Sequence, residues 1–245
     1  MKTFGIERER FIMNSLGQIV PKIGILLPAV HKLAGENSLP ESLFTHELFA
    51  GQIEDRTLPC RNLKELRSAL ITNDQIMSDV ASQLGLTFDY SEFMETSRIT
   101  ALEVNPFDSR HQEIWQAISP ERKIAASIVA AVHVHISADE DEAVKLINFC
   151  RENVIDALIA IGDHSNRMRI NAYRSMAETT GVPQVFASFA DIMSYINAKG
   201  GEKNVWDLVR YKPSTKTIEF RMFGATSNVD EVLEYVKVCL NLFEI

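Results

Sequence analysis

Four strand-like segments of this chain carry charged or imidazole side chains at every second position. Successive side chains of a β-strand point to opposite faces, so residues two apart share a face. The paired positions are Glu7 and Glu9 in GIERERF, Glu54 and Arg56 in GQIEDRT, His133 and His135 in AAVHVHIS, and Glu219 and Arg221 in TIEFRMF. The positions between the pairs are mostly apolar, although Arg8 and Arg10 occupy them in the first segment. This pattern predicts a sheet with one polar face and one core face.

The remaining elements follow from capping residues and apolar spacing. Helices are expected where a capping residue precedes an acid by three positions, which occurs at Asn62, Ser137, Ser188 and Asn228. Two further helices are expected at residues 17–34 and 151–162. Strands are expected at residues 2–13, 48–57, 99–105, 128–136, 205–211 and 217–223, with a hairpin turn at 213–215 between the last two. Strands joined by hairpins indicate an α+β protein with a largely antiparallel sheet.

Composition excludes several classes of protein. The 245 residues are 46% hydrophobic and carry a net charge of −8, which suits one globular core and disfavours non-specific nucleic-acid binding. The N-terminus lacks the apolar segment of a signal peptide, and no apolar stretch is long enough to span a bilayer. We therefore expect a cytoplasmic protein that binds neither membrane nor nucleic acid. The common glycine-rich nucleotide-binding loops are also absent from the sequence.

The polar residues on the predicted sheet face indicate a particular chemistry. Crowded glutamates and imidazoles repel one another unless divalent cations lie between them, and oxygen ligands suit Mg²⁺ or Mn²⁺. Arginine in the same row can bind phosphate or carboxylate through two N–H groups. These residues favour a metal–nucleotide site on an open sheet, and the alternative is the solvated side of a half-exposed sheet. The segment GDHSNRMRINAYR adds Arg167, Arg169 and Arg174, which are either a phosphate clamp or a solvated loop or helix face.

Five segments, taken in order, resemble a known family. GIERE, ELFAGQIEDRTLPCRNLKELR, HVHIS, AYR and TIEFRMF are similar to motifs of the carboxylate–amine ligases of the glutamate–cysteine ligase superfamily. The resemblance implies a glutamine-synthetase-like fold, in which an antiparallel sheet with helices on one face forms half a funnel. It also implies that residues 1–245 form a single catalytic domain.

The resemblance further implies an activity and a set of site residues. The activity is ATP-dependent ligation of a carboxylate, plausibly a γ-glutamyl group, to an amine through an acyl phosphate. Mg²⁺ or Mn²⁺ would be held by Glu7, Glu9, Glu47, Glu54, His133 and Glu219. Arg174 and Arg221 would be catalytic, Arg167, Arg169, Arg174 and Arg221 would bind the nucleotide, and Arg56 and His135 would contact substrate.

Two other functions remain open at this point. The same fold could support a phosphotransferase that stops at a phosphorylated product, or a degenerate domain that binds a nucleotide or a partner protein without turnover. The sequence names neither substrate. A homo-oligomer is also compatible with it, because a sheet of this openness often needs a neighbouring subunit to cover it.

Overall fold

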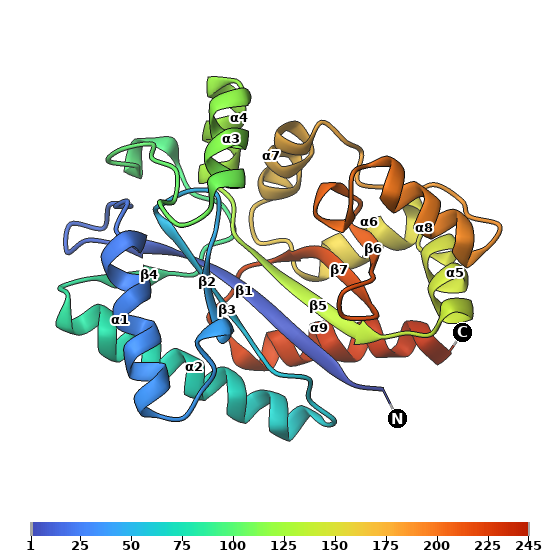
Figure 1. Cartoon of the computed structure of the whole chain (residues 1–245), viewed down its shortest axis with the longest axis horizontal. Helices are drawn as coiled ribbons and strands as arrows, with labels where there is room; N and C mark the ends of the chain where they lie inside the picture. Colours follow the sequence, from blue (N-terminus) through green and yellow to red (C-terminus); the bar gives the residue numbers. More distant parts are fainter. Residues whose placement is uncertain (1, 245) are drawn as a thin grey trace.

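The computed structural model describes residues 2–244 and contains one antiparallel sheet. Its strand order is β2-β3-β1-β5-β7-β6, and β4 pairs with β1 on the side of β5, beyond the end of that strand. The strands are β1 (Phe4–Met13), β2 (Phe44–His46), β3 (Gln52–Arg56), β4 (Thr87–Asp89), β5 (Ala131–Ser137), β6 (Val209–Lys212) and β7 (Thr217–Gly224). Figure 1 shows β1 and β5 side by side through the middle of the molecule. The predicted α+β class with an antiparallel sheet is confirmed.

Helices pack on the apolar face of this sheet and around its ends. The helices are α1 (Ile23–Glu36), α2 (Leu63–Gln83), α3 (Ser109–Ala117), α4 (Pro120–Ser127), α5 (Glu140–Phe149), α6 (Glu152–Ile161), α7 (Met168–Ala177), α8 (Phe189–Ala198) and α9 (Val229–Asn241). Helices α2 and α9 run across the sheet in Figure 1. The largest core cluster joins Leu66 and Leu70 of α2 and Val236 of α9 to Ile6 and Val134 of the sheet.

Three of the four predicted helix caps are confirmed and one is displaced. The side chains of Asn62, Ser188 and Asn228 each accept a hydrogen bond from a backbone N–H in the first turn of their helix. Helix α5 is instead capped by Asp139, which forms a capping box with Glu142. Ser137 remains in β5, because its hydroxyl and its backbone N–H both bond to Thr3.

The predicted strand at residues 99–105 is wrong. This segment makes isolated bridges, Ile99 with Ile19 and Val104 with Phe49, rather than a continuous ladder. Ile99 and Val104 pack as single residues against a small core beneath β1, and Pro106 follows directly. A short apolar run cannot by itself show whether a neighbouring strand is available to pair with it.

Three helices were not predicted from the sequence, namely α3, α4 and α7. Their start signals are present, since Asp108 caps α3, and Ser119 caps α4 with Pro120 in its first turn. Helix α7 starts at Arg167, which adopts φ 65° and has no side-chain cap. All three helices contribute residues to a pocket on the polar side of the sheet.

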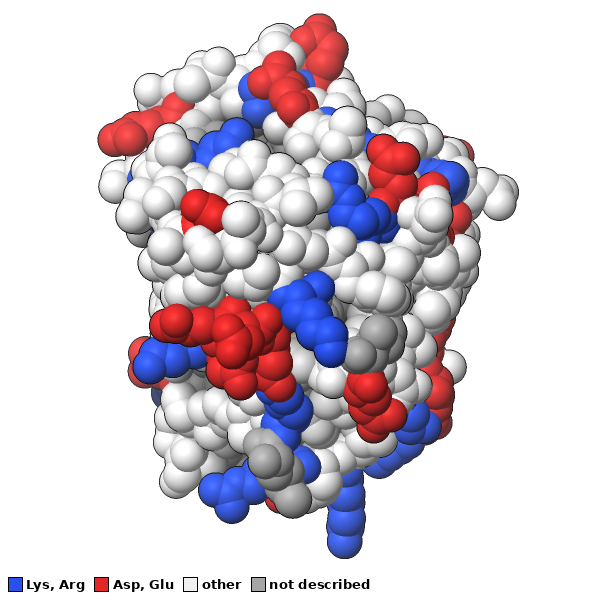
Figure 2. Space-filling view, turned by 90° about the vertical axis from the view of Figure 1, so that its right-hand side faces the viewer, with Lys and Arg blue, Asp and Glu red and all other residues white. Residues whose placement is uncertain are grey.

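The surface on the right of Figure 1 is shown in Figure 2. Several acidic side chains form one compact patch there, while further acids and the lysines and arginines are scattered over the same face. Helix α5 opens with three acids, Glu140, Asp141 and Glu142, which suits the positive end of its dipole. Within residues 2–244, no helix combines the length and the apolar character that crossing a membrane requires.

Candidate functional site

The polar face of the sheet brings together acids and histidines from β1, β3, β5 and β7. Strand pairing sets the arrangement directly: Glu7 lies between Arg56 of β3 and His133 of β5, and Glu9 lies opposite Glu54. His135 lies opposite Glu219 in the next pair. Glu47 joins them from the residue that follows β2. We call these residues the sheet-face cluster: Glu7, Glu9, Glu47, Glu54, His133, His135 and Glu219.

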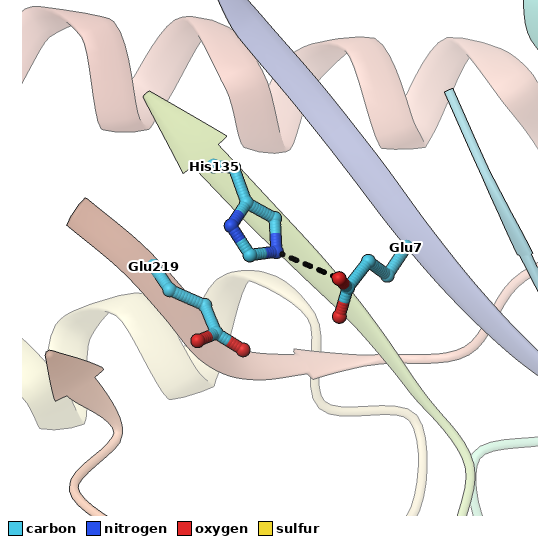
Figure 3. Close-up of side chains that lie close together, drawn as sticks. All are labelled: Glu7, His135 and Glu219. Carbon is cyan, nitrogen blue, oxygen red and sulfur yellow. Dashed lines mark ion pairs between the residues drawn. The ribbon is translucent and has the colours of Figure 1, made fainter. Parts of the chain in front are cut away.

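The side chains of the cluster are close enough to share ions. His133 Nδ1 lies 3.3 Å from Glu7 Oε2 and 3.7 Å from Glu219 Oε1, and its Nε2 lies 3.6 Å from Glu9. His135 Nε2 lies 3.5 Å from Glu7 Oε1, as Figure 3 shows beside Glu219. In three groups of residues, the potential ligand atoms all lie within 4.8 Å of one another. The groups are Glu7, His135 and Glu219; Glu7, Glu54 and His133; and Glu9, Glu47 and Glu54.

Three glutamates of the cluster hold their protons more tightly than usual. Burial and the neighbouring charge of Glu54 raise the pKa of Glu9 to about 8. Burial and Glu9 raise the pKa of Glu47 to about 7, and burial with Glu7 raises that of Glu54 well above its ordinary value. These three carboxyls face one another on the β2–β3 side of the cluster, so each disfavours the charge of the next.

The other side of the cluster is already supplied with cations. Burial alone would raise the pKa of Glu7, but His135, His133 and Lys212 outweigh it and hold that pKa well below the ordinary range. Arg210 and Arg221 do the same for Glu219. Burial and the charge of Arg221 lower the pKa of His133 to about 4, so its imidazole is neutral at pH 7 and one ring nitrogen has a lone pair available for a metal ion.

This donor set fits a hard divalent cation. Carboxylate oxygens and neutral imidazole are ligands that Mg²⁺ and Mn²⁺ accept, and a cation would offset the mutual repulsion that raises three of these pKa values. His135 Nε2 is buried and makes no hydrogen bond within residues 2–244, so it is a further free donor atom at the site.

Two connected cavities open onto the cluster. The larger, which we call the sheet-face hollow, has a volume of about 830 Å³, and most of the residues that line it are charged or polar, among them Arg56, Arg210, Lys212 and Thr217. The smaller, which we call the side pocket, has a volume of about 130 Å³ and lies between the sheet and helices α3, α4 and α7. Glu9, Glu47, His133, Trp206 and Arg221 line both cavities.

The predicted arginines divide into two groups. Arg221 projects from β7, its guanidinium lies over the neighbouring rings of Tyr173 and Trp206, and its Nη1 lies 3.2 Å from Glu219 Oε1. Arg169 is buried on the inner side of α7, lines the side pocket and donates to the carbonyl of Met222.

Arg167 and Arg174 lie elsewhere, in a separate surface depression beside α6. Arg167 pairs with Asp156, and Arg174 Nε donates to the carbonyl of Thr180. Arg169, Tyr173 and Arg174 lie in α7, whose 3.6-residue period turns positions 169 and 173 toward the pocket and position 174 away from it, and Arg167 precedes the helix. The structure therefore does not bring these two arginines to the cluster with which they were predicted to act.

Arg56 does reach the cluster. It pairs with Glu54 and lies 3.6 Å from Glu7, with 43% of its side chain exposed at the hollow. Sequence reasoning missed Arg210 and Lys212, although they show the same two-residue spacing in the segment VRYK of β6. Arg210 Nε lies 2.6 Å from Glu219, and Lys212 Nζ lies 3.2 Å from Glu7.

Comparison with known proteins gives a consistent family match. The family described as glutamate-cysteine ligase family 2 matches residues 3–199. A relative from Roseiflexus sp., provisionally named glutamate–cysteine ligase 2, is 28% identical over 204 residues, which are 76% of this chain and 52% of the relative. A protein with the same provisional name from Herpetosiphon aurantiacus is 25% identical over 94% of this chain and 62% of its own length. The chain spans about half the length of the curated relatives it matches first.

Solved structures share the fold at lower identity. A bifunctional glutathione synthetase from Pasteurella multocida aligns with a TM-score of 0.62 at 14% identity and covers 99% of this chain and 38% of its own. A glutamate–cysteine ligase from Francisella tularensis, solved in complex with AMP, aligns with a TM-score of 0.57 at 12% identity, over 98% of this chain and 66% of its own. A glutamine synthetase from Plasmodium falciparum aligns with a TM-score of 0.52 at 11% identity, over 99% of this chain and 51% of its own. The predicted glutamine-synthetase-like fold is therefore confirmed.

Proposed function

This chain belongs to glutamate-cysteine ligase family 2, and from that membership we propose that its sheet-face hollow is the active site of an ATP-dependent carboxylate–amine ligase. We propose in addition that residues 1–245 form a single catalytic domain. The names of the relatives suggest glutamate as the acid, which would make the product a γ-glutamyl amide.

The observation that carries this proposal is the sheet-face cluster. Glutamates from three separate strands converge with His133 on one face, and three of the carboxyls have raised pKa values because they are buried and lie beside other glutamates. Buried carboxyls placed this close together destabilise the fold unless bound cations offset their charge. Mg²⁺ or Mn²⁺ would be held by Glu7, Glu9, Glu47, Glu54, His133 and Glu219, and when bound would offset the negative charge of the ATP phosphates.

The proposed reaction has two steps. A carboxylate oxygen of the acid attacks the γ-phosphorus of ATP, and ADP leaves as the acyl phosphate forms. The amine nitrogen then attacks the acyl carbon, inorganic phosphate leaves, the amide bond forms and the amine proton passes to water. No side-chain nucleophile is needed, because such chemistry depends on positioning and electrostatic stabilisation.

The chain's own residues would position the reactants and stabilise their charge. Arg221 is held by Glu219 and by the rings of Tyr173 and Trp206, so its guanidinium is fixed at the junction of hollow and pocket. There it can hold a phosphoryl oxygen through its N–H groups. Arg56 and His135 lie in the hollow, where we propose that they contact the acid substrate.

The test is phosphate release that depends on both substrates. Purified protein with Mg²⁺, ATP and glutamate should release phosphate in proportion to added amine, and mass spectrometry should detect the amide. Release of AMP and pyrophosphate would instead indicate adenylation and contradict the acyl-phosphate mechanism. A phosphorylated product that accumulates without amine would favour a phosphotransferase.

A further inference from the structure

The side pocket differs in character from the sheet-face hollow that it adjoins. Its outer walls come from α3, α4 and α7 and the segments between them. They are largely apolar, with Ile114, Ile118, Ala126 and Met176 beside the polar Arg110, His111 and Arg122. The hollow is larger, and the polar residues that line it suit a nucleoside triphosphate and a polar acid. The pocket therefore suits a third ligand with an apolar part.

The size of the pocket limits that apolar part. Its volume of about 130 Å³ is close to that of an apolar protein cavity of about 150 Å³ that binds benzene. A branched aliphatic or a benzyl side chain would fill it, whereas a hydrogen atom or a hydroxymethyl group would leave most of the wall in contact with water.

Two arginines, Arg169 and Arg221, place N–H donors at the inner end of the pocket. Arg169 is 3% exposed, and its Nε lies 3.5 Å from Glu92 Oε2, which is beyond hydrogen-bond distance. Arg221 Nε is buried and has no hydrogen-bond partner in the described part of the chain. A carboxylate is the group that such N–H donors bind best.

The pocket also opens directly onto the reaction site. Glu9, Glu47 and His133 of the cluster form part of its lining, so an amino group at this end would lie beside the proposed acyl phosphate. The pocket thus combines an apolar chamber, donors for a carboxylate and access to the electrophile.

We propose that the side pocket binds the amine substrate, and that this substrate is an α-amino acid with an apolar side chain of about the size of a benzene ring. This inference rests on the ligase activity proposed above. An apolar amino acid cannot serve equally well as the acyl donor, because its single carboxylate would then be consumed and the buried Nε of Arg221 would be left without an acceptor. As the nucleophile it keeps that carboxylate.

Turnover with a panel of amines tests the inference in the wild-type protein. With ATP, Mg²⁺ and glutamate fixed, L-leucine and L-phenylalanine should give kcat/KM values at least about tenfold above those of glycine, L-serine and L-cysteine, since apolar contacts of one or more methylenes give discrimination of that size. L-Leucinamide, which lacks the carboxylate, should be at least about tenfold poorer than L-leucine because the arginines lose their partner.

The outcomes separate this inference from the function on which it rests. Turnover with no preference for apolar amines, or equal use of leucinamide and leucine, would overturn the inference and leave the ligase proposal standing. No turnover with any amine would remove both. Stimulation by leucine in the absence of glutamate would show that it is the acyl donor, which also contradicts the inference.

A variant that fills the side pocket tests whether the side chain of the amine substrate binds there. Ala126→Phe should raise the KM for leucine about tenfold or more while leaving that for glycine within about twofold, since added bulk excludes the larger side chain. Ile124→Phe adds bulk to the same helix at a residue outside the pocket lining, and it should leave both KM values unchanged. An equal effect of the two variants would contradict the assignment.

Fluorescence provides a readout that does not need turnover. The sequence has two tryptophans, and Trp206 lines the pocket whereas Trp115 is buried in a separate core. Leucine should give a saturable emission change in Trp115→Phe and none in Trp206→Phe. If leucine causes no emission change in Trp115→Phe, leucine does not occupy this pocket. If AMP displaces leucine, the adenine base occupies the pocket instead.

Discussion

The glutamates of the sheet-face cluster experience two different electrostatic environments. Glu7 and Glu219 lie against imidazole, lysine and arginine, which keep their pKa values low. Glu9, Glu47 and Glu54 lie mainly against one another in a buried setting, which keeps theirs high. Without metal, the carboxyls of Glu9, Glu47 and Glu54 therefore bind protons where a cation would otherwise offset their charge. Binding of a divalent cation should release them.

Glu9→Gln tests this at a single carboxyl. The pKa of Glu9 is about 8 in the folded protein and about 4.3 in the unfolded chain. Between these two pH values the folded state keeps a proton that the unfolded state loses, so Glu9 lowers the free energy of unfolding progressively as pH rises. The amide keeps an oxygen for the N–H of Ala131 and removes the charge. In metal-free buffer the variant should melt at or above the wild-type temperature at pH 8. Its turnover should fall by at least about a hundredfold.

Urea unfolding at pH 5 and pH 8, with phosphate-release kinetics, measures both effects. Glu113→Gln changes an exposed glutamate of α3 in the same way and should alter neither. If Glu9→Gln turns over at the wild-type rate, Glu9 does not belong to the active site.

At the scale of elements, β1 joins the active site to the support beneath it. Glu7 and Glu9 face the hollow, while Arg8 and Arg10 point to the opposite face, where both are buried and pair with Asp55 of β3 and Asp74 of α2. Asp55 also accepts a hydrogen bond from Asn73, so one carboxylate joins two strands and a helix. This network explains how a strand with charges on both faces can lie in the middle of the sheet.

Removing the charge of Asp55 should destabilise the fold strongly. Burial alone would raise the pKa of Asp55, but Arg10 and Arg8 outweigh burial and lower it. The charged carboxylate of Asp55 therefore stabilises the fold above about pH 3.9, and this stabilisation is lost as pH falls through the pKa of the folded state. Asp55→Asn leaves two buried guanidinium groups short of a partner and should cost about 3–5 kcal/mol at pH 7.

Guanidinium chloride unfolding of Asp55→Asn beside Asp74→Asn checks this value. Asp74 meets the same two arginines, but 27% of its side chain is exposed, so its replacement should cost clearly less. Equal losses for the two variants would show that burial of Asp55 is not what makes the network strong.

At the scale of the molecule, the sheet is covered by helices on its apolar face, while its other face opens to a hollow of about 830 Å³. The acids of that hollow come from segments spread from β1 to β7, so a bound cation would link the two ends of the chain. Such a ligand binds the folded state and stabilises it as a whole.

Mg²⁺ should therefore raise the thermal stability of the whole protein, and do so more at high pH. At a hundredfold excess over its dissociation constant the gain is about 2.7 kcal/mol. Because Glu9 and Glu47, with pKa values of about 8 and about 7, must lose protons to bind the cation, the gain should be larger at pH 8.5 than at pH 6.

Melting curves with increasing Mg²⁺ at the two pH values make this measurement. Glu9→Gln should gain less than the wild-type protein, and Glu113→Gln should gain as much. A gain that is the same at both pH values, or unchanged in Glu9→Gln, would mean that the metal stabilises the protein at another place.

The sequence by itself determined which residues share a face and where several helices begin. Glu7 with Glu9, and His133 with His135, follow from the two-residue period of a strand, which is a property of the backbone and holds wherever the strand lies. The caps at Asn62, Ser188 and Asn228 follow in the same way from hydrogen bonds within one turn. The resemblance to the ligase family rested on these same local segments.

Only the tertiary structure decided which of these faces meet. That Glu9 lies opposite Glu54, and that Lys212 reaches Glu7, depends on the order of strands in the sheet, and no local signal encodes that order. The turn of α7 likewise separates Arg169 from Arg167 and Arg174, although all three looked equivalent in one polar segment. The raised pKa of Glu9 is of the same kind, because burial and the nearness of Glu54 arise from contacts between residues far apart in the chain.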